Sequence, residues 1–247
     1  MTRLAVALAW LVWSVSGAWA QTCETVSYKA NRYAVCDVDM AQADLRLFLY
    51  GPNDLILGQF QNVDRVLEPA GQTLAFAMNA GMYHDNRRPV GHYVENGQEL
   101  MRVVPNAGPG NFGLLPNGVF CIRANRADVY ETRAFQAAAP DCDYATQSGP
   151  MLVIDGALHP RFLIDSTSRF VRNGVGTSAD GQRAVFVISS NTVTFHEFGS
   201  FFKDALKLPN ALYFDGNISR LYAPSIGRND PGFAMGPIVG LVTERKE

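Results

Sequence analysis

Short polar segments that follow apolar stretches carry the side chains of this sequence that could do chemistry. Asn and Gln amides both donate and accept hydrogen bonds, which suits sugar hydroxyls, and the guanidinium fork of Arg suits phosphate oxygens. Strand ends and adjacent loops commonly carry such sites because a sheet holds them rigidly. We therefore expect one shared cleft. The candidate residues are Asn79, Asn111, Gln147, Ser148, Arg172, Asn173, Asp215 and Ser219.

Several of these segments also have a simpler interpretation. Asn117-Gly118 and Asp155-Gly156 are typical of hairpin turns, and Gln147-Ser148-Gly149 could form a β-bulge. Thr146 stands where the Gly-x-Ser-x-Gly motif needs glycine, so no hydrolase nucleophile elbow is expected. The four histidines lack metal-ligand spacing, and no metal site is predicted. Asp and Asn oxygens suit calcium, so a divalent cation stays open as a cofactor.

The first 20 residues have the organisation of a cleavable signal peptide. Arg3 supplies a positive start, Leu4–Val15 is almost wholly apolar, and Ala18-Trp19-Ala20 offers small residues at a cleavage site. A membrane anchor is the alternative, but about 20 apolar residues are needed to span a bilayer. We expect residues 21–247 to be the working chain, periplasmic or secreted, with no membrane span after cleavage.

Composition indicates a globular protein with a sizeable core. Hydrophobic residues make up 47% and charged residues 18%, and the net charge of −2 gives no basic footprint for nucleic acid. The four cysteines of an exported chain suit disulfides, with three pairings open. We predict the two short-range pairs, Cys23–Cys36 and Cys121–Cys142. A zinc site lacks the required ligand spacing.

Strand-like segments dominate and must position the polar side chains. Apolar spacing of three and four predicts helices at Phe60–Leu67 and from Thr194 to Leu206, the second ended by Pro209. We predict an α+β fold, a single domain over 21–247 with a large curved mixed sheet and a few packing helices. The predicted strands are Ser27–Val38, Leu45–Tyr50, Leu74–Met78, Val119–Ile122, Met151–Ile154, Ala184–Ser189 and Ala211–Phe214.

At the polar segments the chain resembles the phosphodiester glycosidase domain family, and looks closest to a bacterial exported branch. The resemblance covers about residues 75–222 in the family's order. One departure lies after Asp215, where the animal-type pattern Asp-Gly-Gly-Gly-Ser is replaced by Asp-Gly-Asn-Ile-Ser, which narrows the loop or changes what it admits. The matching segments are Met78–Tyr83, Asn111–Phe120, Ala145–Leu152, Arg172–Gly176 and Ala211–Ser219.

The resemblance implies hydrolysis of a sugar-1-phosphodiester between the anomeric carbon and the phosphate oxygen. Asp215 would then act at the anomeric centre or as base for water, and Arg172 on the phosphate. Asp85 is a candidate second carboxylate. Asn79, which we count among the catalytic residues, and the remaining candidates would orient hydroxyls or water. The expected partner is a carbohydrate or glycan phosphodiester, and the oligomeric state is left open. The alternative is a non-catalytic glycan-binding module of the cell envelope.

Overall fold

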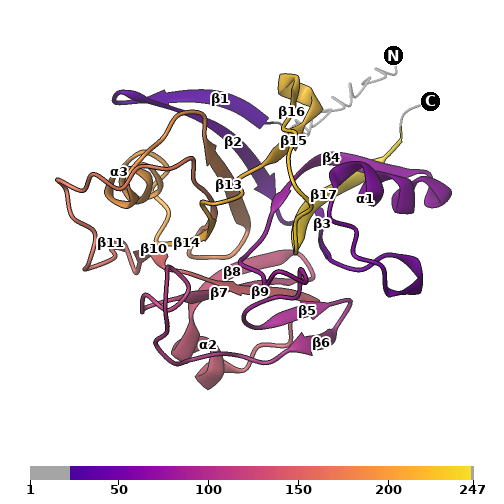
Figure 1. Ribbon diagram of the computed structural model, residues 1–247, viewed down its shortest axis with the longest axis horizontal. Coiled ribbons are helices and arrows are strands. Elements are labelled where there is room, and N and C mark those ends of the chain that lie inside the picture. The colour runs from indigo at the N-terminus through magenta and orange to yellow at the C-terminus, as the bar shows by residue number, and fades with distance from the viewer. Residues whose placement is uncertain (1–22, 246–247) are drawn as a thin grey trace, which may run out of the picture.

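The computed structural model describes residues 23–245, so the predicted signal peptide at residues 1–20 lies outside the described residues. The described chain is mostly β, with strands in three sheets and three short α-helices (Figure 1). Every paired strand runs antiparallel. The prediction of one large curved mixed sheet is therefore wrong, whereas the few packing helices of the predicted α+β fold are present. Parallel pairs need crossovers of a dozen or more residues, usually helical, and this chain instead joins many neighbouring strands by tight turns.

The largest sheet has seven strands and carries most of the predicted ones. The predicted strand Ser27–Val38 is a hairpin, because the chain turns at Lys29, whose φ is 52°. Asp155-Gly156 forms the predicted turn, between the strands Met151–Ile154 and Ala157–Leu158, with φ of 45° and 80°. The order is β1 (Cys23–Tyr28), β2 (Asn31–Asp39), β13 (Arg183–Ser189), β12 (Asn173–Thr177), β14 (Asn210–Asp215), β10 (Met151–Ile154) and β11 (Ala157–Leu158).

Strand β12 lies in the middle of this sheet and was not predicted, because its sequence is rich in glycine. Gly174 and Gly176 are buried between β13 and β14. A Cβ on Gly174 would overlap the carbonyl oxygen of Leu212, and one on Gly176 would lie 2.8 Å from Leu208. The glycines therefore allow β12 to approach its neighbours, although glycine weakens an ordinary strand.

The other two sheets have five strands each. The predicted strands Leu45–Tyr50, Leu74–Met78 and Val119–Ile122 are present there with small shifts of their ends. The second sheet has the order β16 (Arg228–Asn229), β15 (Leu221–Ala223), β4 (Gln72–Asn79), β17 (Ile238–Glu244) and β3 (Asp44–Phe48). The third has the order β6 (Gln98–Met101), β5 (Tyr93–Glu95), β9 (Tyr144–Ser148), β7 (Gly118–Arg123) and β8 (Arg126–Glu131).

Aromatic side chains from all three sheets meet in one hydrophobic cluster. Phe186 of β13 lies 5.2 Å from Phe76 of β4 and 5.7 Å from Phe120 of β7, measured between ring centroids. Phe214 of β14 joins them through Phe120 at 6.3 Å. All four rings are buried. Because large aromatic rings dominate core energetics, this contact fixes the three sheets relative to one another.

Three short helices of the described chain pack against the sheets. Helix α1 (Phe60–Leu67) is as predicted, and buries Phe60, Val63 and Leu67 while Val66 stays 40% exposed. Helix α3 (Phe195–Ser200) begins at the predicted Thr194 with a capping box to Glu197, and continues as a π-helical turn (Phe201–Ala205). Helix α2 (Thr132–Ala138) was not predicted. No helix within residues 23–245 is long and apolar enough to cross a membrane.

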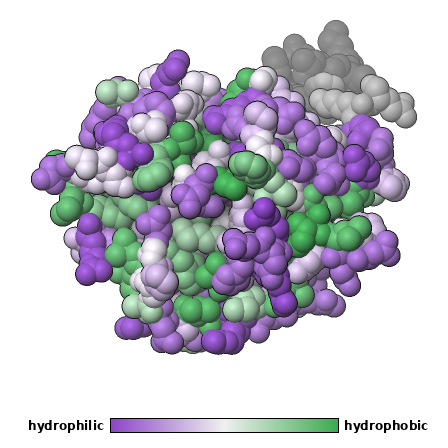
Figure 2. All heavy atoms as spheres, viewed as in Figure 1, coloured by the Kyte–Doolittle hydropathy of each residue, from purple (hydrophilic) through white to green (hydrophobic). Residues whose placement is uncertain are grey.

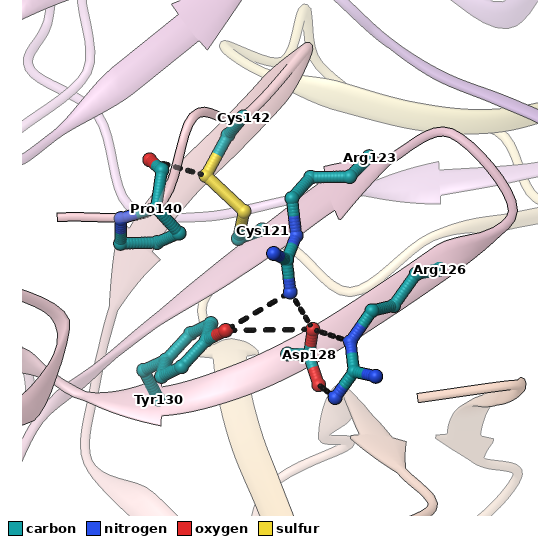
Figure 3. The surroundings of a disulfide bond; sticks show 7 residues. All are labelled: Cys121, Arg123, Arg126, Asp128, Tyr130, Pro140 and Cys142. Carbon is teal, nitrogen blue, oxygen red and sulfur yellow. Dashed lines mark hydrogen bonds and ion pairs between the residues drawn. A yellow bond between two sulfur atoms is a disulfide. The ribbon is translucent and has the colours of Figure 1, made fainter. Parts of the chain in front are cut away.

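Both predicted disulfides are present. Cys23 and Cys36 stand opposite each other in the β1–β2 hairpin. Cys121 on β7 bonds to Cys142, in the segment before β9 (Figure 3). Beside it, Asp128 on β8 accepts from Arg123 at 2.5 Å and from Arg126 at 2.7 Å. This end of the third sheet is thus held by a covalent bond and an ion-pair cluster.

Candidate functional site

Asn173, the first residue of β12, is the centre of the candidate site. Its side chain is fully buried. The amide nitrogen donates to the carbonyl oxygen of Asn79 at 2.9 Å and to its side-chain oxygen at 3.1 Å. The Asn173 side-chain oxygen accepts from the Asp215 backbone nitrogen at 3.2 Å. One amide therefore joins the ends of β4, β12 and β14, which belong to two different sheets.

Asp215 ends β14 and shapes the turn that follows. Its Oδ1 accepts from the backbone nitrogen of Gly216 at 2.6 Å and of Asn217 at 3.0 Å. Ser219 closes the turn by donating to the Asp215 carbonyl oxygen at 2.8 Å. Burial raises the pKa of Asp215, outweighing the backbone N–H groups that lower it. A carboxylate whose pKa is raised accepts a proton more readily than a free aspartate, which suits a group that takes up and returns a proton.

Two further contacts tie this cluster to the rest of the fold. The hydroxyl of Ser148, at the end of β9, donates to the Phe214 carbonyl oxygen at 2.8 Å, one residue before Asp215. The side-chain oxygen of Asn79 also accepts from the Arg220 backbone nitrogen at 2.9 Å. All three sheets thus contribute to the surroundings of Asp215.

Arg172 lies one residue before Asn173 and is only 1% exposed. Its Nε donates to the Val193 carbonyl oxygen at 2.9 Å, and Nη2 donates to the Ser168 carbonyl oxygen at 3.2 Å. The guanidinium carbon stands 3.6 Å from the centre of the Phe195 ring, a cation–π contact. Within residues 23–245 no carboxylate forms an ion pair with Arg172, and burial lowers its pKa. A buried cation without a carboxylate partner favours binding of an anionic ligand.

Tyr213 connects the two halves of the site and was missed by the sequence analysis. Its hydroxyl accepts from Arg172 Nη1 at 3.4 Å and is hydrogen-bonded by the Asn111 side chain. Burial and the nearby Asp215 carboxylate raise the pKa of Tyr213, so the phenol stays protonated. A Cβ on Gly216 would overlap the same hydroxyl. One feature of the sequence could have indicated a role for Tyr213: it lies two residues before Asp215 on a predicted strand.

Phe195 and Tyr83 were also not among the predicted site residues. Phe195 opens α3 and supports the Arg172 guanidinium. Tyr83 lies close enough to Asp215 for the carboxylate to add to the burial that raises the pKa of Tyr83. No pattern in the sequence distinguishes Phe195 from the other aromatic residues of its helix, and Tyr83 is one of several polar residues in its segment.

Two predicted residues are held elsewhere. The Gln147 amide donates to the Val104 carbonyl oxygen at 2.8 Å, and its oxygen accepts from the backbone nitrogens of Val104 at 2.9 Å and His92 at 3.0 Å. In the described part of the chain Gln147 makes no hydrogen bond to another candidate residue and instead fixes the segment around Val104. Asp85 is exposed on the loop after β4. That all the candidates line one cleft therefore stays a prediction.

Among residues 23–245 the structure contains no cluster of side chains that could bind a metal ion through His, Cys, Asp or Glu: no group of three or more of these residues there is arranged to hold one.

The replaced residues of the turn after Asp215 have different surroundings. Ile218 is half-buried and packs against the hydrophobic cluster that includes Phe60 and Leu57 near α1. Asn217 is exposed. The isoleucine thus anchors the turn to the second sheet, where the glycine of the animal-type pattern would offer no side chain to bury.

Several solved structures are similar to this chain in fold. A hypothetical protein from Synechocystis aligns with a TM-score of 0.57 at 12% identity, covering 90% of this chain and 61% of the other. The zebrafish N-acetylglucosamine-1-phosphodiester alpha-N-acetylglucosaminidase catalytic domain, auto-inhibited by its pro-peptide, aligns with a TM-score of 0.59 at 11% identity, covering 89% and 81%. A putative exported protein from Burkholderia pseudomallei K96243 gives a TM-score of 0.53 at 13% identity, covering 85% and 74%. These likenesses establish the fold.

The family model for phosphodiester glycosidases matches residues 72–240, and the chain belongs to that family. The match includes the Asn79, Arg172, Asn173 and Asp215 positions. The uncharacterized protein YigE of Escherichia coli strain K12 is 37% identical over 146 residues, which are 59% of this chain and 57% of that protein. The chain therefore aligns with little more than half the length of that relative.

Proposed function

We propose that this chain is an exported hydrolase that cleaves a sugar-1-phosphodiester between the anomeric carbon and the phosphate oxygen. The observation that carries the proposal is that two unlike groups, Arg172 and Asp215, both lie near Tyr213. The Tyr213 hydroxyl accepts from Arg172 Nη1 at 3.4 Å, and the nearby Asp215 carboxylate adds to the burial that raises the pKa of Tyr213. A buried cation and a carboxylate of raised pKa therefore adjoin the same phenol without forming an ion pair with each other. The substrate of such a pair carries an anion next to an electrophilic carbon.

Arg172 is assigned to the phosphate. Its guanidinium is fixed by two carbonyl oxygens and the Phe195 ring, so little conformational entropy remains to be lost on binding. A phosphomonoester leaving group gains negative charge as the bond breaks, and a preorganised cation stabilises that charge. Tyr213 and Asn111 stand beside it as neutral hydrogen-bonding groups.

Asp215 is assigned to the sugar. An oxocarbenium-like transition state is stabilised by a nearby carboxylate, which also serves as base for the attacking water. Phosphate is a good leaving group, so a strong general acid is less necessary than for an ordinary glycoside. Asn79, Asn173 and Ser219 fix the Asp215 turn. The candidate second carboxylate, Asp85, is not needed for this assignment.

Export is the proposed location. Two disulfides suit an oxidising compartment such as the periplasm or the exterior. The predicted signal peptide at residues 1–20 agrees with this, and the proposed partner is a glycan phosphodiester of the cell envelope or its surroundings.

The test is hydrolysis of sugar-1-phosphodiesters of both anomers, beside the matching neutral glycosides, by the wild type and by Asp215→Asn. The variant keeps the shape and the hydrogen bonds of the side chain but removes its charge. We expect kcat to fall by at least about a hundredfold with KM nearly unchanged. Full activity of Asp215→Asn would remove Asp215 from the mechanism. Binding without turnover by the wild type would favour the glycan-binding module.

A further inference from the structure

A long connection between β11 and β12 borders the candidate site. Residues 159–172, here the 159–172 loop, contain no helix or paired strand beyond the single bridge at Phe170. Connections of this length without regular structure are uncommon in compact domains, and where ordered they are usually functional. In Figure 1 the loop follows β11 on the left of the molecule.

The 159–172 loop is anchored to α3 and its flanks. The Phe162 ring is stacked between His159, at 4.8 Å, and Phe195, at 5.0 Å, by ring centroids. Phe170 exchanges two backbone hydrogen bonds with Val193, at 3.1 and 2.8 Å. Arg169 forms an ion pair with Glu197 at 2.9 Å. These contacts hold the loop in place along its length.

Despite this anchoring, three large apolar side chains of the loop face solvent. Leu163 is 65% exposed, Ile164 81% and Phe170 46%. Figure 2 shows hydrophobic atoms reaching the left edge of the molecule, the side on which Figure 1 places β11. Exposed apolar residues that gather on one ordered segment are typical of a surface that another apolar group covers.

The loop ends at Arg172, the residue assigned to the phosphate, and earlier loop residues contact that side chain. The Ser168 carbonyl oxygen accepts from Arg172 Nη2 at 3.2 Å, and the Arg172 guanidinium lies 5.4 Å from the Phe170 ring centre. The Phe170 Cβ would stand 3.7 Å from a Cβ on Gly216, the residue after Asp215. Phe170 therefore adjoins both Arg172 and the Asp215 turn.

Chain geometry limits how far the apolar tip lies from the phosphate position. Ile164 is four residues before Ser168, and an extended chain covers at most about 3.6 Å per residue, or about 14 Å. An alkyl chain of moderate length attached to a phosphate on Arg172 can span that distance. Phe170 and then Leu163 and Ile164 offer it apolar contact along the way.

We propose that the 159–172 loop is the aglycone subsite and that the substrate is a sugar-1-phosphodiester of an apolar alcohol. This inference rests on the proposed function. In the reaction a water oxygen bonds to the anomeric carbon, and the bond from that carbon to the phosphate oxygen breaks with its electron pair going to oxygen. The water proton passes to Asp215 and then to solvent. The products are the free sugar and the phosphomonoester of the apolar alcohol.

The experiment measures kcat/KM for one sugar-1-phosphate esterified with methyl, butyl, hexyl and octyl alcohols, all below their aggregation concentrations. For the wild type we expect kcat/KM to rise about two- to fourfold per methylene that the loop covers. The double variant Leu163→Ser/Ile164→Ser and the single variant Phe170→Ser should flatten this chain-length dependence. Leu55→Ser, which replaces another leucine that is 67% exposed, is the matched control and should keep the wild-type dependence.

The outcomes separate this inference from the proposed function. Hydrolysis of all four esters at equal kcat/KM would overturn the apolar aglycone and leave the phosphodiester activity standing. A chain-length dependence that the loop variants keep would overturn the assignment to the 159–172 loop. No hydrolysis of any ester of several sugars, in both anomers, would reject the proposed function. Loop-dependent cosedimentation with lipid vesicles, without a chain-length dependence, would assign the loop to membrane binding and overturn the subsite.

Discussion

The side-chain amide of Asn173 donates to both the backbone and the side-chain oxygen of Asn79, which lies 94 residues earlier in the chain. Asn79 donates back to the Asn173 oxygen at 3.3 Å, and both residues are fully buried. This reciprocal pair links the first sheet to the second, and the same Asn173 oxygen accepts from the Asp215 backbone nitrogen. Stability and activity should therefore depend on the same side chain.

Replacing Asn173 by alanine should lower both. The change removes the Asn173 hydrogen bonds to Asn79 and to the Asp215 backbone nitrogen, although the Asn79 side-chain oxygen keeps its bond from Arg220. Each buried polar group left unpaired costs about 1–3 kcal/mol. We expect the free energy of unfolding in urea to fall by about 2–4 kcal/mol. Asn217→Ala, an exposed amide in the neighbouring turn, is the matched control. A loss no larger than that of the control would contradict the central role of Asn173.

Arg172→Lys should separate phosphate binding from sugar chemistry. Lysine keeps a positive charge but loses the planar fork and the Nε bond to Val193. We expect KM for phosphodiesters to rise and kcat to fall, together on the order of a hundredfold in kcat/KM, with a much smaller effect on a neutral glycoside. Arg169→Lys, three residues earlier at the surface, is the control. Equal losses on charged and neutral substrates would remove the phosphate role.

Gly216→Ala should disturb Arg172 indirectly. The new Cβ overlaps the Tyr213 hydroxyl, which Arg172 contacts, and overpacking of this kind costs about 1–3 kcal/mol. We expect lower thermal stability together with weaker phosphodiester binding. Adding Tyr213→Phe removes the hydroxyl and should restore part of the stability, but not the binding. If the two changes were simply additive in stability, the predicted overlap would be wrong.

Glu95, which is not one of the candidate site residues, predicts a pH dependence of stability. Its carboxylate accepts from the Tyr93 hydroxyl at 2.8 Å and the Leu49 backbone nitrogen at 3.1 Å, yet burial raises the pKa of Glu95 from 4.5 to about 7. Between pH 4.5 and 7 the folded state binds more protons than the unfolded state. This contribution is therefore fully present below pH 4.5 and is lost as the pH rises through 7.

The measurement is urea unfolding of the wild type and Glu95→Gln at pH 5 and pH 8. The neutral amide keeps both hydrogen bonds and does not ionise, so the variant should be more stable than the wild type at pH 8 by about 2 kcal/mol. At pH 5 the difference should nearly vanish. The exposed Glu24→Gln serves as the control. A variant less stable than the wild type at both pH values would show that the charged form is favoured in the folded protein.

Local sequence patterns predicted most elements that depend only on local order. Apolar runs such as Met151–Ile154 correctly predicted strands. The spacing of Phe60, Val63 and Leu67 predicted α1, and both predicted disulfides close short loops. These features succeed because periodicity, caps and loop closure act over a few residues. The motifs around Asp215 and Arg172 likewise carried the resemblance to the phosphodiester glycosidase family.

Contacts between distant segments were decided only by the tertiary structure. Glycine-rich β12 forms a central strand because β13 and β14 pack against it, which its own composition disfavours. Gln147 is polar like Asn173, yet its amide is consumed by Val104 and His92, while Asn173 is placed against Asn79 and Asp215. Residue type states which hydrogen bonds a side chain can make, but the partner depends on which strands lie beside it. The arrangement of three antiparallel sheets around one core makes that choice.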